Sequence, residues 1–146
     1  MLIKTKDFEY IEISEEDIIS FPNGVYGFED TKKFVILKNP ENIWMMYLQS
    51  AENEDPRFIL LDPFMIFEDY NPLLPEGAFE LLGASDKKDL NFFVVTVVPE
   101  NIKDMTVNLK SPVVINFDKK IGAQVILENK EYTVRTRVFP DEGTGA

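Results

Sequence analysis

The sequence predicts a mainly all-β fold: a small antiparallel β-barrel-like single domain with one or two short helices. Its 146 residues are the size of one domain. Val, Ile, Phe, Tyr and Thr dominate the periodic stretches, and these residue types favour strands. Turn residues interrupt the stretches about every 8–12 positions, a spacing typical of sandwiches and barrels. Because many short strands follow one another in this way, we expect a closed or nearly closed antiparallel barrel.

The predicted strands follow the apolar runs of the sequence. In chain order they cover residues 2–6, 8–13, 18–21, 34–38, 44–49, 58–61, 91–98, 105–108, 113–116, 123–127 and 132–138. Pro, Asn, Gly and Asp supply the backbone conformations of tight turns. They predict turns at residues 22–24, 118–122 and 128–130, of which the last two close hairpins.

Two of these strands have contrasting patterns. Residues 132–138 alternate, with Arg135 and Arg137 on the polar face, which predicts a half-buried strand with a basic solvent face. Residues 92–98 are apolar on both faces. We therefore expect a central strand there, covered on both sides.

Two short helical segments are expected between the strands. Pro75 can occupy the first turn of a helix, Glu76 complements the helix dipole, and Gly83 can end the helix. The sequence therefore predicts a helix over residues 75–82. Ser14 precedes a run of acidic residues and predicts a single helical turn that it caps.

The segment from Asp62 to Pro75 combines aromatic, acidic and proline residues. Its prolines lack backbone N–H donors, so it cannot form a regular central strand. One interpretation is an irregular segment that closes the barrel, with Phe64 and Phe67 filling the core. The other is an interface of aromatic anchors with an acidic rim. The two are compatible, and both stay open.

The residue types that are missing exclude much chemistry. The chain contains no His and no Cys, so it has no imidazole base, no thiol nucleophile and no ligand of either kind for a metal. It lacks the nucleophile elbow, the P-loop and the dinucleotide-binding fingerprint, and its acidic stretches lack EF-hand spacing. We therefore expect no enzymatic activity, no cofactor and no metal site.

The net charge is −11, from 15 Lys and Arg against 26 Asp and Glu. We expect no direct binding to nucleic acid or to an acidic membrane surface, because both attract clustered Lys and Arg. No apolar run reaches the ~18 residues of a spanning helix, and the N-terminus lacks the apolar region of a signal peptide. These features predict a cytoplasmic protein.

The negative charge is concentrated in residues 41–80, which contain nine acidic residues and one Arg, a net charge of −8. Residues 81–146 contain nine acidic and nine basic residues and are neutral overall. Two interpretations of the acidic region stay open. It is either a solvated surface that keeps the protein soluble or an acidic face for a basic partner.

Several stretches, in the same order along the chain, resemble the flagellar assembly factor FliW family. Residues 21–29 resemble the family's N-terminal signature, Phe-Pro-x-Gly-x-x-Gly-Phe-Glu, and residues 106–116 contain its Thr-x-Asn-Leu-x-x-Pro block. The other matches are Leu48-Gln49-Ser50, Asp62-Pro63 with Asp69-Tyr70, and Gly122-Ala123-Gln124-Val125 followed by Tyr132 and Arg135. The resemblance implies a FliW-like β-barrel domain over residues 1–138. We expect a flexible tail over residues 139–146.

The resemblance also implies a role and two protein partners. It implies a cytoplasmic, non-enzymatic protein that binds the RNA-binding translational repressor CsrA and thereby keeps it from silencing flagellin messenger RNA. It implies binding of flagellin, which would compete for the protein and free the repressor. Two alternatives stay open: a flagellin chaperone without direct control of the repressor, and a small-ligand-binding barrel.

For the repressor, the resemblance implies a binding surface made of two segments. One is the loop after Leu48-Gln49-Ser50, and the other follows Asp62-Pro63. The candidate residues are Asn53, Glu54, Asp55, Arg57, Phe67, Glu68, Asp69, Tyr70, Asn71 and Pro75. Because both segments lie in the most acidic part of the chain, we expect one acidic face that meets a basic RNA-binding protein.

Overall fold

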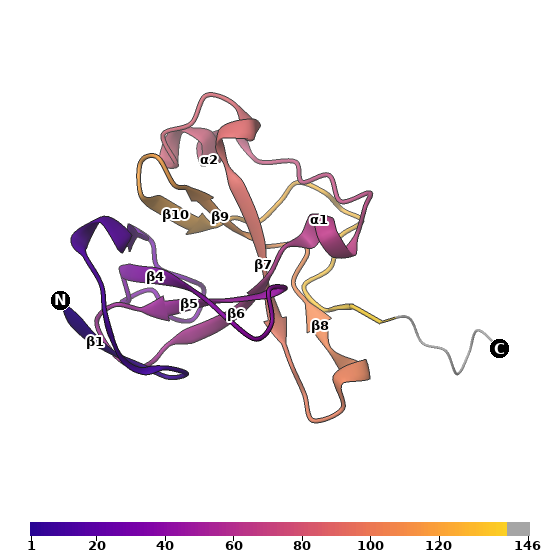
Figure 1. Cartoon of the computed structure of the whole chain (residues 1–146). Coiled ribbons are helices and arrows are strands. Elements are labelled where there is room, and N and C mark those ends of the chain that lie inside the picture. The colour runs from indigo at the N-terminus through magenta and orange to yellow at the C-terminus, as the bar shows by residue number, and fades with distance from the viewer. Residues whose placement is uncertain (140–146) are drawn as a thin grey trace.

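The structure, a computed structural model, describes residues 1–139. Its strands and α-helices are β1 (Leu2–Thr5), β2 (Glu9–Glu12), β3 (Ile19–Ser20), β4 (Lys33–Lys38), β5 (Met45–Ser50), β6 (Arg57–Leu61), α1 (Pro63–Ile66), α2 (Glu76–Leu81), β7 (Asn91–Val97), β8 (Thr106–Val107), β9 (Val113–Asn116), β10 (Ile121–Gln124) and β11 (Thr136–Arg137), as Figure 1 shows in part. Short 3-10 helices lie at η1 (Glu15–Asp17), η2 (Lys87–Asp89) and η3 (Ile102–Asp104). Apart from Phe139, the tail predicted over residues 139–146 lies outside the described residues.

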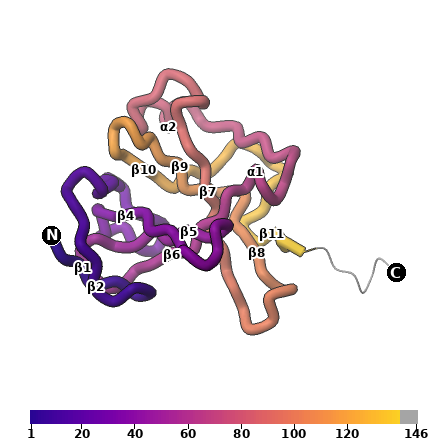
Figure 2. Tube along the Cα trace, in the orientation of Figure 1, coloured from indigo at the N-terminus to yellow at the C-terminus, as the bar shows by residue number. Residues whose placement is uncertain are grey.

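A ring of strands closes into a barrel. β7, β6, β5, β4, β3, β10 and β9 are neighbours in that order, and β9 pairs again with β7. All these pairs are antiparallel except that of β3 with β10. β8 and β11 extend the sheet outward from β7, and β1 and β2 form a separate hairpin (Figure 2). The prediction of a small antiparallel barrel is confirmed.

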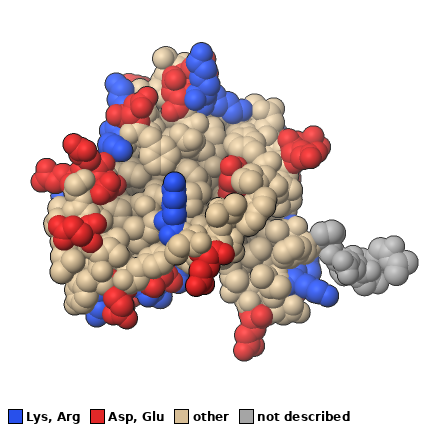
Figure 3. All heavy atoms as spheres, viewed as in Figure 1, with Lys and Arg blue, Asp and Glu red and all other residues tan. Residues whose placement is uncertain are grey.

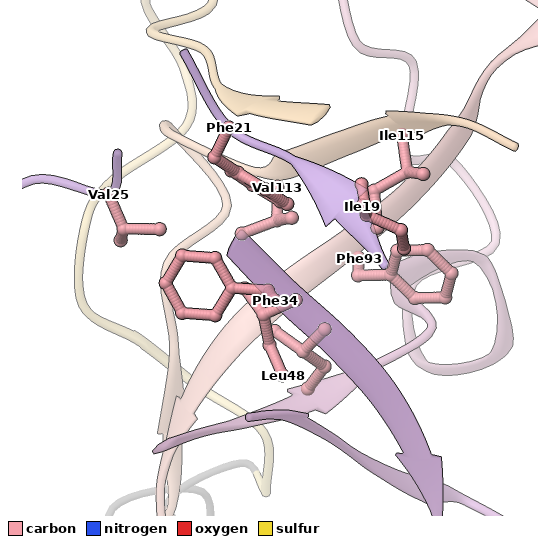
Figure 4. Close-up of a cluster of buried hydrophobic side chains, with 9 residues drawn as sticks. Ile19, Phe21, Val25, Phe34, Leu48, Phe93, Val113 and Ile115 are labelled. Atoms are coloured by element: carbon pink, nitrogen blue, oxygen red, sulfur yellow. The ribbon is translucent and has the colours of Figure 1, made fainter. Parts of the chain in front are cut away.

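Apolar side chains fill the barrel interior. Successive residues of a strand point to opposite faces, so alternate positions such as Phe34 of β4, Leu48 of β5 and Leu60 of β6 point inward and are fully buried. Figure 4 shows Phe34 and Leu48 together with other inward side chains from several strands. The rings of Phe21 and Phe34 meet edge to face with centroids 5.0 Å apart. The described side chains therefore occupy the centre of the barrel, where a small ligand would need a cavity.

The central strand predicted from residues 92–98 is confirmed as β7. It pairs with β6, β8 and β9. Phe93 packs inside the barrel, whereas Phe92 and Val94 are buried in two other apolar clusters on its outer side. Burial on both faces explains why this stretch lacks the alternation of a half-buried strand.

One predicted strand near the C-terminus is displaced. β10 covers Ile121–Gln124 rather than residues 123–127, because Lys120 adopts a left-handed φ of 55° and the strand begins directly after this turn. The hairpin predicted at residues 118–122 is confirmed by the antiparallel pairing of β9 with β10. Directly after β10 the Val125 N–H donates to the Pro112 carbonyl, so backbone hydrogen bonding between the two segments continues one residue beyond the strands.

The hairpin predicted at residues 128–130 is wrong, and of the strand predicted over residues 132–138 only β11 is observed. Within the described residues only Thr136–Arg137 of this stretch form a strand, and Val134 is 63% exposed. Asn129 is buried, and its side chain bonds to the backbone of residues 71–73 instead of serving a hairpin turn. Hydrogen bonds to a segment remote in sequence replace the expected strand pairing.

The two predicted helical segments are confirmed. α2 covers Glu76–Leu81, and Gly83 with a φ of +64° follows its end. η1 follows Ser14, whose N–H donates to the Asp17 carboxylate at 2.9 Å in a capping box. Within residues 1–139, no helix combines the length and apolar character needed to span a membrane.

The sequence prediction lacks the helix α1. Asp62 caps this helix by accepting the Phe64 N–H at 2.9 Å, and Pro63 takes the first helical position. A single helical turn, α1, therefore follows β6 directly, where the sequence predicts an irregular segment. It directs the chain away from the barrel and sets the position of residues 67–75.

The expectation that Phe64 fills the core is wrong. Phe64 is 43% exposed and meets the rings of Tyr70 and Phe92 at their edges. Phe67 is half-buried and packs against an apolar cluster as expected. Tyr70 is the aromatic side chain that this segment buries, with 5% exposed.

Candidate protein-interaction surfaces

The two predicted binding segments lie at opposite ends of β6. The loop of residues 51–56 precedes this strand, and residues 67–75 follow it after α1. β6 has 5 residues, which at about 3.3 Å per residue separate the two ends by roughly 16 Å. The two segments are here called the loop surface (51–57) and the α1-end surface (67–75).

Buried polar side chains of β5 shape the loop surface. The fully buried Gln49 donates through Nε2 to the carbonyls of Asn53 at 3.2 Å and Glu54 at 2.8 Å. Its Oε1 accepts the Lys6 N–H at 3.1 Å, which ties the loop to the N-terminal hairpin. The Ser50 hydroxyl accepts two further loop N–H groups. These bonds hold the loop backbone in one conformation, because buried polar groups left unpaired are costly.

The N-terminal hairpin neutralises much of the charge on the loop surface. Glu54 lies 3.7 Å from the Lys4 ammonium, and Asp55 lies 3.0 Å from that of Lys6. All four side chains are exposed, so each pair contributes only about 0–1 kcal/mol to stability. Their charges nevertheless balance locally, which weakens the attraction of this surface for a basic partner.

Arg57 is engaged within the protein. Its Nε lies 2.8 Å from Asp7 Oδ2, and its guanidinium lies 5.3 Å from the centroid of the Tyr47 ring. The Arg57 and Asp7 side chains are only 18% and 24% exposed. Arg57 therefore connects the β1–β2 turn to the barrel. Among the candidate residues of this surface, Asn53 is uncharged and has an exposed side chain that a partner can contact.

Aromatic side chains anchor the α1-end surface. The Tyr70 hydroxyl donates to the Leu109 carbonyl at 2.8 Å, and the rings of Tyr70 and Tyr132 lie 4.8 Å apart between centroids. The Tyr132 hydroxyl accepts the Asn71 N–H at 2.7 Å. Burial, with a smaller effect of Tyr132, raises the pKa of Tyr70 above its ordinary value. Tyr70 is thus a support for this surface rather than an exposed contact residue.

A buried asparagine completes this support. Asn129 is 3% exposed; its Nδ2 donates to the Asn71 carbonyl at 2.9 Å, and its Oδ1 accepts the Leu73 N–H at 2.7 Å. The segment between Tyr70 and Leu73 therefore has partners for its backbone although it belongs to no strand.

The acidic pair Glu68 and Asp69 lies on this anchored segment. Both side chains are exposed, and neither forms an ion pair with any residue in 1–139. Phe67 and Pro75 beside them are half-buried, and Asn71 is exposed and accepts the Lys87 ammonium at 3.1 Å. The α1-end surface thus presents two acidic side chains without an ion pair in residues 1–139, whereas the loop surface presents one, Glu52.

The sequence pattern alone did not identify Gln49 and Asn129 as the residues that organise these surfaces. A glutamine inside an apolar strand run, as in Leu48-Gln49, signals a buried amide with several partners. Asn129 carries no such signal, because an Asn between polar neighbours is equally typical of a turn.

Figure 3 shows one face with charged side chains mostly around its margin and uncharged side chains across its centre; the acidic groups at the left edge lie over the N-terminal segment. Among residues 1–139, no group of three or more Asp or Glu could hold a metal ion.

Comparisons with known proteins agree with this architecture. The family described as FliW protein matches residues 2–138. The flagellar assembly factor FliW of Natranaerobius thermophilus is 41% identical, with 100% of this chain and 97% of the relative covered. That of Ruminiclostridium cellulolyticum is 39% identical, with 97% and 96% covered. A crystal structure described as the flagellar assembly factor FliW superposes with a TM-score of 0.91 at 37% identity and covers 97% of this chain and 99% of its own. The chain belongs to the FliW protein family.

Proposed function

We propose that this protein is a cytoplasmic flagellar assembly factor that binds and antagonises the translational repressor CsrA and that also binds flagellin. The proposal is supported by full-length relatives that carry the name flagellar assembly factor. The observation that carries it in this chain is the exposed, unpaired acidic pair Glu68 and Asp69 on a segment held in place by buried side chains.

The α1-end surface is suited to a basic protein. An RNA-binding repressor carries clustered Lys and Arg, and complementary charge speeds encounter and favours the correct partner. The anchoring of the segment by Tyr70 and Asn129 lowers the conformational entropy lost on binding. Carboxylates docked beside an RNA site also repel phosphates, so the antagonism needs no direct overlap with the RNA contacts.

We propose protein contact, rather than catalysis or small-ligand binding, as the activity of the fold. The side chains of Phe21, Phe34, Leu48 and Leu60 occupy the barrel interior, each with 0% exposure. A ligand-binding barrel keeps an internal cavity at this place, so the filled interior disfavours that alternative.

A pull-down with purified repressor, in the absence and presence of purified flagellin, tests the proposal. The immobilised protein is expected to retain the repressor and to release it when flagellin is added. No retention of the repressor would contradict direct antagonism, and retention of flagellin alone would favour a chaperone role. A stable complex of all three proteins would contradict competition between the partners.

A further inference from the structure

An apolar groove lies beside the α1-end surface. It has a volume of about 390 Å³ and is lined mainly by apolar side chains, among them Trp44, Leu61, Ile66, Ile102 and Phe139. Trp44, Ile102 and Phe139 are 53%, 58% and 40% exposed. Large apolar side chains gathered around a concave surface are typical of an interaction site rather than of free surface. The groove begins at α1, directly before Glu68 and Asp69.

The backbone around the groove is already paired. Met45 of β5 lies opposite Leu61 of β6 in the antiparallel ladder, and the Val138 N–H donates to the Met105 carbonyl at 3.0 Å. Met45, Leu61 and Val138 therefore offer paired backbone to an extended peptide, which binds by adding a strand. The nearby edge strand β11 has only two residues. A helix satisfies its own backbone groups and presents only side chains. The groove accordingly suits the apolar face of a helix.

The chain segments that supply the lining residues of the groove are acidic in sequence. The segments that form it, residues 39–44, 62–69, 98–104 and 137–139, contain six acidic residues and two basic residues, a net charge of −4. The two basic residues are Lys103 and Arg137, and Arg137 already pairs with Asp104 at 3.5 Å. Glu41, Glu68 and Asp69 form no ion pair with residues 1–139. Charge complementarity therefore favours an occupant with Lys and Arg beside its apolar face.

We propose that this groove binds an amphipathic helix of a basic protein partner, with apolar side chains against Trp44 and Ile102 and basic side chains over its acidic segments. The identity of the partner as the repressor rests on the proposed function, whereas the chemistry of the helix follows from the groove alone.

Trp44 provides a direct probe, because it is the only tryptophan of the chain. A Trp-free synthetic peptide with leucines at helical i, i+3, i+4, i+7 spacing and lysines elsewhere is titrated into the protein. Binding is expected to shift Trp44 emission to shorter wavelength and to protect it from acrylamide, saturably and less strongly at high salt. A peptide of the same composition with scattered leucines is expected to leave the emission unchanged. No change of Trp44 emission up to about 1 mM helical peptide would overturn the inference.

A matched pair of variants assigns the site. Ile102→Ser removes an apolar side chain of the groove, whereas Ile126→Ser removes one of similar exposure, 54%, from a different surface pocket. Ile102→Ser is expected to weaken peptide binding about tenfold or more, the effect of losing one well-placed contact. Ile126→Ser is expected to bind as the unsubstituted protein does. Equal affinities of the two variants would overturn the assignment to the groove.

The same variants, titrated calorimetrically with purified repressor, separate this inference from the proposed function. Weaker binding of the repressor by Ile102→Ser alone supports both. Tight binding that is unaffected by Ile102→Ser would overturn the groove as the repressor site and leave the proposed function standing. Failure of the repressor to bind the unsubstituted protein would overturn the proposed function, and the peptide titration would still decide whether the groove binds a basic helix.

Discussion

Gly122 of β10 faces the ring of Phe21 inside the barrel. A Cβ atom at this position would lie 2.6 Å from Phe21 Cζ, and Phe21 is fully buried between β3 and its neighbours. The Gly-Ala-Gln-Val stretch that supports the family resemblance therefore begins with a residue required by packing. A motif residue of this kind carries information about the fold and none about a binding site.

Replacement of Gly122 tests this packing. Gly122→Ala is expected to lower the free energy of unfolding by about 1–3 kcal/mol in urea denaturation, because the added methyl overpacks the barrel. Gly77→Ala in α2 is the control, since nothing lies within 4 Å of its added Cβ. It is expected to be neutral or to raise stability by up to about 1 kcal/mol. Equal losses in the two variants would contradict the packing argument.

Tyr70 links stability to alkaline pH. Burial raises the pKa of its phenol above the ordinary value, so the unfolded chain loses this proton first, near pH 10. The stabilisation is fully present below about pH 10 and declines as pH rises further. Tyr70→Phe is expected to reduce the decline, measured as unfolding free energy between about pH 8 and 11. Tyr10→Phe, whose ring is 59% exposed, is the control; the same decline in both variants would contradict the role of Tyr70.

The two candidate surfaces are irregular segments held mainly by buried polar side chains. Gln49 bonds to the loop after β5, and Asn129 bonds to the segment after α1. Neither segment has a strand ladder to satisfy its backbone, so the amide side chains take that role. This arrangement places exposed acidic residues on rigid supports outside the barrel.

Removal of the Gln49 side chain is expected to loosen the loop surface. Gln49→Ala leaves the carbonyls of Asn53 and Glu54 without this donor and is expected to cost about 1–3 kcal/mol of unfolding free energy. Hydrogen exchange is expected to accelerate at the Lys6 amide and over residues 51–56. Gln124→Ala is the control, because Gln124 accepts the Tyr26 N–H at 3.1 Å elsewhere. Faster exchange spread evenly over the barrel would contradict a local role for Gln49.

Across the whole protein, the two acidic surfaces differ in how many of their carboxylates are paired with a basic side chain. On the loop surface Glu54 and Asp55 are paired with Lys4 and Lys6, which leaves Glu52 without an ion pair in residues 1–139. On the α1-end surface both acidic residues, Glu68 and Asp69, are without one. Steering of a basic partner depends on uncompensated exposed charge. The α1-end surface is therefore expected to dominate the salt dependence of binding.

Charge reversal tests this distribution. Glu68→Lys with Asp69→Lys is expected to weaken repressor binding in titration calorimetry and to flatten its dependence on salt. Glu15→Lys with Glu16→Lys, an adjacent and exposed acidic pair in η1, changes the net charge equally and is the control. Unchanged affinity and salt slope in the first variant would contradict the assignment of the α1-end surface. Equal effects of the two double variants would show that repressor binding depends on net charge and not on the position of Glu68 and Asp69.

Most of the strands could be predicted because their signal is local. Alternation and turn residues identified β4, β5, β6, β7 and β9 within one or two residues of their observed bounds. The same local rules failed for residues 128–135, where Asn129 and Tyr132 bond to residues 71–73 instead of pairing as strands. They also failed for Phe64, which the turn of α1 directs to the surface.

The amino-acid order thus determined the number of short strands, the confined acidity of residues 41–80 and the absence of His and Cys, because these properties need no distant contact. Contacts between remote residues decided the rest. The pairing of β9 with β7 closes the barrel, and β6 sets the two acidic segments at its opposite ends. Lys4 and Lys6 then pair with Glu54 and Asp55 of one segment, whereas Glu68 and Asp69 of the other stay exposed and without an ion pair in residues 1–139.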